Sequence, residues 1–146
     1  MKILAMVAIA VTLAACADPG EQGKQIRIDD LRGKWVVINY WAQWCKPCIQ
    51  EIPELNELDR SYEQLVVVGV NYDGATGDEL ADQVGKLNIE FAILPHDPAG
   101  SLGTSRPMVL PTTLILNPDG ELTQTLLGPQ TLASLAQATE QAPPNH

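Results

Sequence analysis

Two cysteines separated by two residues constrain this chain more than any other feature. Cys45 and Cys48 follow the apolar run 35–40, which has the length of a buried strand. A Cys-x-x-Cys pair that opens a helix directly after a strand is typical of redox-active thiols. Because the two thiols lie one helical turn apart, one could attack a disulfide while the other waits to release the product.

The rest of the chain alternates strand-like and helix-like segments. Strands are expected at 35–40, 65–72, 92–94 and 112–116, and helices at 45–62, 78–87 and 131–141. Ile26 and Ile28 alternate with polar residues, which predicts a short edge strand. The turn sequence Asn117-Pro118-Asp119-Gly120 predicts that 123–127 returns as an antiparallel strand. This order predicts an α/β protein with a mixed central sheet flanked by helices.

Chain length, net charge and the number of possible metal ligands limit what kind of protein this can be. A chain of 146 residues fits one domain, expected over 26–142 and as a monomer, and its net charge of −9 argues against a nucleic-acid partner. A zinc site would need two ligands beside the cysteine pair, but His96 and His146 are isolated. Covalent haem needs a histidine directly after the second cysteine, where Ile49 stands. No metal or cofactor is therefore expected.

The N-terminal segment has the pattern of a secretory signal peptide. Lys2 precedes the apolar run 3–13, and small residues follow, which predicts a signal peptide over 1–15. Leu13-Ala14-Ala15-Cys16 also resembles the bacterial lipobox, in which the cysteine sulfur carries a diacylglycerol. We therefore expect lipidation at Cys16, a tether over 16–25 and a membrane-anchored protein facing the periplasm. Ala17 resembles an outer-membrane sorting signal, and ordinary cleavage to a soluble secreted protein stays open as the alternative.

The helix position of each cysteine suggests its chemistry. Cys45 would lie in the first turn, where free backbone N–H groups and the helix dipole favour a thiolate and hence nucleophilic attack. Cys48, one turn later, could then break the mixed disulfide. Glu51 shares the face of Cys48 with an apolar stripe formed by Leu55, Leu58 and Tyr62. Burial there would raise the pKa of Glu51 and allow proton exchange with Cys48, although Glu51 could instead reach solvent from the first turn.

Two motifs resemble a known family. The segment Trp41-Ala42-Gln43-Trp44-Cys45-Lys46-Pro47-Cys48 resembles the active site of the thioredoxin superfamily. The segments 34–53 and Leu110-Pro111-Thr112-Thr113 resemble its TlpA/ResA branch of envelope thiol–disulfide oxidoreductases. The likeness extends over 26–141 and implies a thioredoxin-like fold. It also implies a redox disulfide between Cys45, the attacking cysteine, and Cys48, the resolving one.

The resemblance bears on six further residues. Pro111 matches the family's cis-proline beside the cysteines, and the backbone of Leu110 would pair with an extended client segment. Trp44 and Pro47 would form an apolar surface that faces the client. Glu51 matches the branch's buried glutamate. Asn39 stands where cytoplasmic thioredoxins carry a buried aspartate, so proton handling is expected to pass to Glu51.

The function expected from this resemblance is an envelope reductase of client-protein disulfides. Clients could be apocytochrome c or copper-site cysteines, and a membrane thiol oxidoreductase would return electrons to the pair. The same chemistry could run backwards, as an oxidant or isomerase, because direction depends on the reduction potential. A non-catalytic Cu(I)-binding module that uses Cys45 and Cys48 is the alternative from another class. Thiol peroxidase activity is disfavoured, because Ala42 stands where those enzymes carry a threonine.

Overall fold

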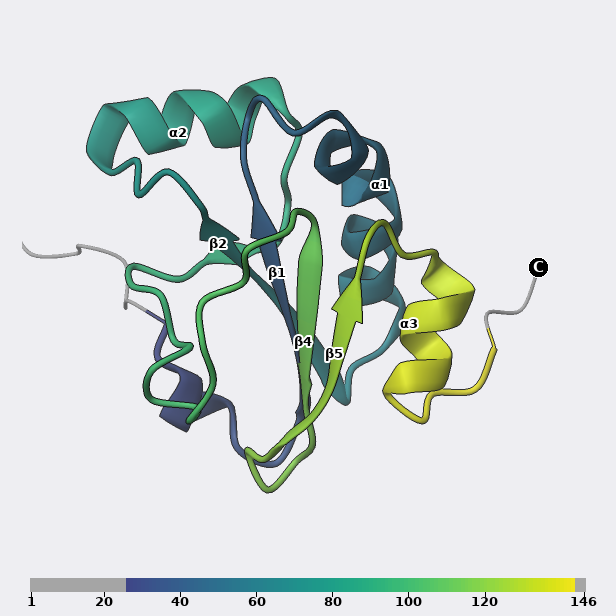
Figure 1. Cartoon of the computed structure of the whole chain (residues 1–146). Coiled ribbons are helices and arrows are strands. Elements are labelled where there is room, and N and C mark those ends of the chain that lie inside the picture. Colours follow the sequence, from purple (N-terminus) through teal and green to yellow (C-terminus); the bar gives the residue numbers. More distant parts are fainter. Residues whose placement is uncertain (1–25, 144–146) are drawn as a thin grey trace, which may run out of the picture.

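A five-stranded sheet in the order β3-β2-β1-β4-β5 organises the chain (Figure 1). The computed structural model describes residues 26–143. The expected signal peptide 1–15, the tether 16–25 and the lipidation residue Cys16 lie outside this range. The elements in chain order are a 3-10 helix Ile28–Leu31, β1 Trp35–Trp41, α1 Lys46–Ser61, β2 Leu65–Asn71, α2 Gly77–Lys86, β3 Ala92–Ile93, β4 Thr112–Leu116, β5 Leu122–Leu127 and α3 Leu132–Ala138.

β1 is the central strand, which explains its continuous apolar sequence. It pairs in parallel with β2 and antiparallel with β4, so that Asn39 lies between Gly69 and Thr113. Every residue of β1 after Trp35 is buried, since both faces of the sheet are covered. The mixed sheet and its principal strands are therefore confirmed.

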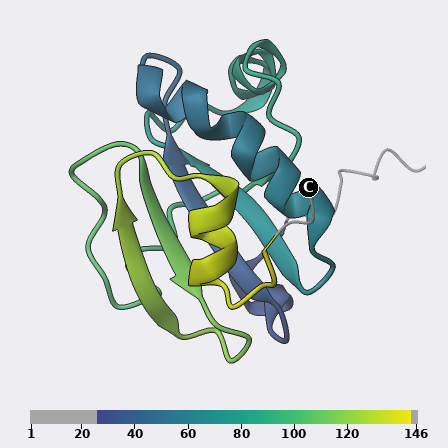
Figure 2. The same cartoon turned by 90° about the vertical axis from the view of Figure 1, so that its right-hand side faces the viewer.

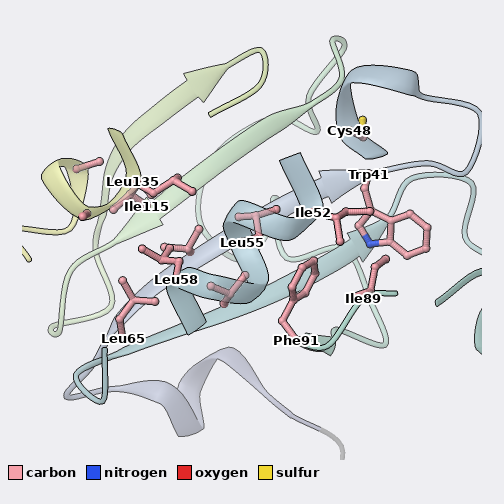
Figure 3. Close-up of a cluster of buried hydrophobic side chains, with 14 of the residues drawn as sticks. Trp41, Cys48, Ile52, Leu55, Leu58, Leu65, Ile89, Phe91, Ile115 and Leu135 are labelled. Atoms are coloured by element: carbon pink, nitrogen blue, oxygen red, sulfur yellow. The ribbon is translucent and has the colours of Figure 1, made fainter. Parts of the chain in front are cut away.

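The two faces of the sheet are covered differently. α1 and α3 pack on the face that carries Val37, Trp41 and Ile115 (Figures 2 and 3). The apolar side of α2 packs against the same cluster. On the opposite face, Ile38 and Tyr40 lie in a second cluster. That cluster is covered by residues of the 3-10 helix and of the segment between β3 and β4 rather than by an α-helix.

The edge strand expected at Ile26 and Ile28 is wrong. Residues 28–31 form a 3-10 helix, and the Asp30 N–H donates to the carbonyl oxygen of Arg27 at 3.0 Å. This turn directs Ile28 and Leu31, three residues apart, toward the second apolar cluster. Two apolar residues separated by one polar residue are compatible with a strand or with a 3-10 helix. Packing against the second apolar cluster favours the 3-10 helix.

α3 is shorter than predicted. The helix ends at Ala138, because Glu140 adopts a left-handed conformation with φ of 55°. The Gln141 N–H then reaches back to the carbonyl oxygen of Ala136 at 2.8 Å, which is the closing hydrogen bond of a Schellman motif. Glycine usually fills the left-handed position, so a glutamate there gave no stop signal in the sequence.

Candidate active site

The cysteine pair lies where β1 passes into α1. Cys45 is the N-cap of α1, and its Sγ accepts a hydrogen bond from the backbone N–H of Cys48 at 3.3 Å. The two residues form a disulfide, with their Cα atoms 5.3 Å apart. Pro47 occupies the first turn of the helix, where its missing N–H leaves no hydrogen bond unmade. Once reduced, Cys45 would have a backbone donor and the helix N-terminus to stabilise its thiolate.

Exposure distinguishes the two sulfur-bearing residues. Cys45 retains 4% of its surface, whereas Cys48 retains none. Cys48 also belongs to the buried apolar cluster that contains Trp41 (Figure 3). Gly69 makes room for that indole, since a methyl group on Gly69 would lie 2.9 Å from the Nε1 atom of Trp41. An outside disulfide can therefore approach Cys45 more readily than Cys48.

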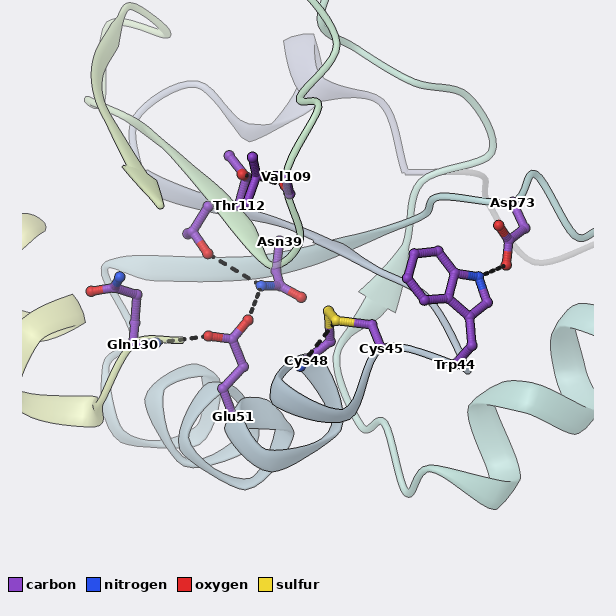
Figure 4. The surroundings of a disulfide bond; sticks show 10 residues. Asn39, Trp44, Cys45, Cys48, Glu51, Asp73, Val109, Thr112 and Gln130 are labelled. Atoms are coloured by element: carbon purple, nitrogen blue, oxygen red, sulfur yellow. Dashed lines mark hydrogen bonds between the residues drawn. A yellow bond between two sulfur atoms is a disulfide. The ribbon is translucent and has the colours of Figure 1, made fainter. Parts of the chain in front are cut away.

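Glu51 is a buried carboxylate one helical turn after Cys48. Only 1% of its surface is exposed, so the alternative in which it reaches solvent is wrong. Its Oε1 accepts a hydrogen bond from Asn39 Nδ2 at 2.5 Å, and its Oε2 accepts one from the Gln130 N–H at 2.8 Å (Figure 4). Burial raises the pKa of Glu51 to about 6, and these two donors limit the rise. Glu51 can therefore gain or lose a proton near neutral pH.

Asn39 connects β1, α1 and β4 inside the protein. Besides Glu51, its Nδ2 donates to Thr113 Oγ1 at 3.2 Å. Its Oδ1 is buried and has no hydrogen-bond partner within the described part of the chain. The sequence pointed to Asn39 only by its position in a motif. Thr113, a partner of Asn39, and Gln130, a partner of Glu51, are both far from β1 along the chain. Thr113 ends the Leu110-Pro111-Thr112-Thr113 motif, whereas Gln130 gave no signal.

An exposed apolar surface borders the end of β1 that leads to the cysteines. Because β4 runs antiparallel to β1, the Leu110–Pro111 bond before β4 lies at that same end, and this bond is cis as the resemblance predicts. Exposed apolar side chains near these residues belong to Trp44, Met108, Val109 and Leu127, which are 63%, 94%, 54% and 66% exposed. Leu127 is tied to the site because it pairs with Thr112 across the sheet. Met108, Val109 and Leu127 were missed by the sequence reasoning.

Trp44 is held in place although it is exposed. Its Nε1 donates a hydrogen bond to Asp73 Oδ2 at 2.9 Å, which links the residue before Cys45 to the segment after β2 (Figure 4). An exposed indole that is already oriented loses little conformational freedom when it binds a partner.

The described residues, 26–143, bear on metal binding and on membrane crossing. Over this range, no group of three or more histidine, cysteine, aspartate or glutamate residues could hold a metal ion. Within the same range, no helix has the length and apolar character needed to cross a membrane.

Several known proteins are similar to this chain in sequence. The AhpC/TSA family model matches residues 8–125. The thiol-disulfide oxidoreductase ResA of Bacillus thuringiensis (strain Al Hakam) is 32% identical over 115 residues, which cover 78% of this chain and 66% of that protein. The thioredoxin-like protein YneN of Bacillus subtilis (strain 168) is 35% identical over 121 residues, which cover 79% and 69%. This chain thus spans about two thirds of the length of these relatives.

A solved structure supports the same assignment. The crystal structure of a DsbF homologue from Corynebacterium diphtheriae matches with a TM-score of 0.67 and 28% identity, and covers 79% of this chain and 76% of that one. The relatives named ResA confirm the branch that the motifs resembled. Because the family model matches well over half of the sequence, the chain belongs to the AhpC/TSA family and has a thioredoxin-like fold.

Proposed function

We propose that this protein is a thiol–disulfide oxidoreductase that reduces the disulfides of client proteins through its Cys45–Cys48 couple. The observation that carries the proposal is the position of Cys45, which caps a helix, keeps some exposure and is bonded to a fully buried cysteine. A thiolate at such a position is stabilised and can be reached by an outside disulfide. The family membership and the name of the ResA relative support the same activity.

The reaction would proceed in two exchanges. The Cys45 thiolate attacks one sulfur of the client disulfide, forms a bond to it, and expels the other client sulfur as a thiolate. Cys48 then loses its proton, for which Glu51 is the buried acceptor, and attacks the Sγ of Cys45. The second client sulfur leaves as a thiolate, so the client has gained two electrons, and the cysteine pair, now the Cys45–Cys48 disulfide, has lost them. A dithiol donor of the membrane, another thiol oxidoreductase, would restore the pair.

The client would lie along the cis-proline. Within the described part of the chain, neither the N–H nor the C=O of Leu110 has a hydrogen-bond partner. Both groups are available to pair with an extended client segment, with Pro111 beside them. The client-binding surface would include Trp44 and Pro47, as expected from the sequence, together with Met108, Val109 and Leu127, which are exposed in the structure.

Trp44→Ala should lower kcat/KM for a protein client about tenfold, because exposed aromatic residues carry much of the binding energy of such surfaces. Reduction of glutathione disulfide should change less than about twofold, since so small a substrate contacts less of the surface. Stopped-flow measurement of both reactions would check this. Trp44→Phe is the matched control, because it keeps the ring but loses the hydrogen bond to Asp73. Equal losses for both substrates would show that Trp44 acts on the cysteines rather than on the client.

The leader pattern and the family membership support a proposed location and proposed partners. We place the protein in the bacterial envelope, anchored by lipid at Cys16 after removal of 1–15 and facing the periplasm as a monomer. Cysteines of apocytochromes c or of a copper oxidase are the client class that this placement favours. Mass spectrometry of the protein from membranes should find a diacylglycerol on Cys16. An unmodified Cys16 would favour the soluble secreted form.

The activity is tested with the reduced full-length chain and insulin. We expect insulin chains to be released while one Cys45–Cys48 disulfide forms for each insulin disulfide reduced. The reduction potential, measured against a glutathione buffer, determines direction, because each tenfold change in the equilibrium constant is about 30 mV. A potential high enough to oxidise a client dithiol, with no insulin reduced, would assign the protein as an oxidant.

A further inference from the structure

Two buried side-chain atoms among residues 26–143 have no hydrogen-bond partner there, Asn39 Oδ1 and Trp41 Nε1, and the first is an acceptor. Asn39 is 0% exposed, and its Oδ1 atom, which is inaccessible to solvent, accepts no hydrogen bond from any residue that the structure describes. A buried acceptor without a donor is unfavourable, and native proteins retain such atoms rarely. The steps proposed above use Cys45, Cys48 and Glu51 but give Asn39 no role. The atom therefore requires an explanation.

The orientation of the carboxamide follows from its neighbours. The Nδ2 atom donates to Glu51 Oε1 at 2.5 Å and to Thr113 Oγ1 at 3.2 Å. An ionised carboxylate can only accept hydrogen bonds, so the amide must turn its nitrogen toward Glu51. The amide oxygen, Oδ1, then points away from Glu51.

The side of Asn39 away from Glu51 faces the cysteines. Asn39 lies between Val37 and Trp41 on β1, and both of these belong to the apolar cluster that contains Cys48. Glu51 and Cys48 are three residues apart on α1, so their side chains lie on the same helical face. Figure 4 shows Asn39 between Glu51 and the disulfide, with its Oδ1 on the side of Cys48. Trp41 Nε1, the other unpaired atom, makes no hydrogen bond to this oxygen. On the side to which Oδ1 points, the Cys48 thiol is a donor that exists only after reduction.

We propose that Asn39 is a positioning residue whose Oδ1 accepts a hydrogen bond from the Cys48 S–H in the dithiol form. This inference rests on the proposed redox function of the pair. In the disulfide form Cys48 has no proton to donate, so the acceptor stays unsatisfied; in the dithiol form the bond is made. Asn39 thereby favours the dithiol and keeps the resolving cysteine protonated while Cys45 attacks.

The consequence is measurable as an exchange equilibrium with glutathione. In the balanced reaction, two glutathione thiols become glutathione disulfide while the Cys45–Cys48 disulfide accepts two electrons and two protons to become two thiols. Removing the acceptor should shift this equilibrium toward the protein disulfide. The protein would then be a stronger reductant.

Asn39→Leu tests the proposal, because leucine has a similar size but neither donates nor accepts a hydrogen bond. We expect the ratio of disulfide to dithiol in a fixed glutathione buffer to rise about tenfold, a potential about 30 mV more negative. Thr113→Val is the matched control, since it removes the other partner of Nδ2 and leaves Oδ1 in place. Its ratio should stay within about twofold of that of the unsubstituted chain. A merely structural role of Asn39 would lower stability in both variants and shift neither equilibrium.

A second measurement keeps the test decisive if Asn39→Leu does not fold. Infrared spectra of the reduced full-length chain carrying Cys16→Ser and Cys45→Ser contain the S–H stretch of Cys48 alone. A hydrogen-bonded thiol absorbs at lower frequency than a free one, and we expect the lower band. An S–H band at the free-thiol frequency, or an unchanged equilibrium in Asn39→Leu, would overturn the inference. If the unsubstituted pair cannot be cycled by glutathione at all, the proposed function fails instead.

Discussion

Cys45→Ser should lower the rate of insulin reduction by at least about a thousandfold, because the attacking thiolate is lost and serine cannot replace it. The structure explains why Cys45 rather than Cys48 should attack the client. Cys45 is at the helix N-terminus and 4% exposed, whereas Cys48 is 0% exposed. Steady-state insulin reduction with the full-length chain measures the effect. Full activity in Cys45→Ser would refute the assignment of the nucleophile.

Cys48→Ser is the matched variant, since it removes the other sulfur of the same disulfide. Cys45 can still attack, but nothing resolves the mixed disulfide, so a covalent complex with the client should accumulate. Non-reducing electrophoresis with a defined disulfide peptide would detect one adduct for each chain. If Cys48→Ser turned over normally and Cys45→Ser trapped the peptide, the two roles would be reversed.

Glu51→Gln should slow the resolving step about hundredfold, because general acid–base groups contribute about 10²–10⁴ to such rates. Glutamine preserves the shape of the side chain but cannot accept the proton of Cys48. The first exchange, attack by Cys45, should change little, which separates the two steps. Rapid mixing of the reduced chain with a client peptide, quenched by acid, would follow the mixed disulfide as it forms and decays. Equal slowing of both steps would contradict a role in resolution.

The same carboxyl group should make stability depend on pH. Burial raises the pKa of Glu51 from 4.5 to about 6, so between these values the folded chain holds a proton that the unfolded chain has lost. The folded state binds more protons there, and the free energy of unfolding therefore falls as pH rises, by about 2 kcal/mol in total. Urea denaturation between pH 4 and 7 measures this contribution.

Glu54→Gln provides the control for that pH dependence. Glu54 is on the same helix and also accepts a backbone N–H, from Leu132 at 2.7 Å, but it is only partly buried. Glu51→Gln should remove the fall in stability above pH 4.5, whereas Glu54→Gln should retain it. A fall that persists in Glu51→Gln would assign it to another group.

Most of the fold could be predicted because its elements carry local signals. The apolar runs at β1, β2 and β4 mark buried strands, and the turn from Asn117 to Gly120 marks the hairpin into β5. The errors occurred where the local signal was short or ambiguous. Ile26 and Ile28 fit a strand by alternation, but contacts with the second apolar cluster selected a 3-10 helix. The end of α3 depends on the left-handed backbone at Glu140, for which the side chain gives no hint.

Part of the site could likewise be predicted from neighbouring residues, and part depended on residues distant in sequence. Cys45 caps α1, and Cys48 and Glu51 follow at intervals of three residues. This spacing alone places the two sulfur atoms and the carboxylate one helical turn apart, along one side of the helix. Spacing could not decide whether Glu51 is buried. That depended on Asn39 from β1 and Gln130 before α3, whose contacts with Glu51 join residues 12 and 79 positions apart in sequence.

The sequence by itself determined the chemistry, since a Cys-x-x-Cys pair at the start of a helix sets which atoms can react and how far apart they lie. Only the tertiary structure decided the environment of that pair: a buried Glu51 with a raised pKa, an Asn39 oxygen without a donor, and an exposed surface of Trp44, Met108, Val109 and Leu127. The physical reason is that helix geometry is set by hydrogen bonds between residues close in sequence. Burial, and with it the energy of a charge or an unpaired acceptor, depends on side chains that the fold brings together from distant positions.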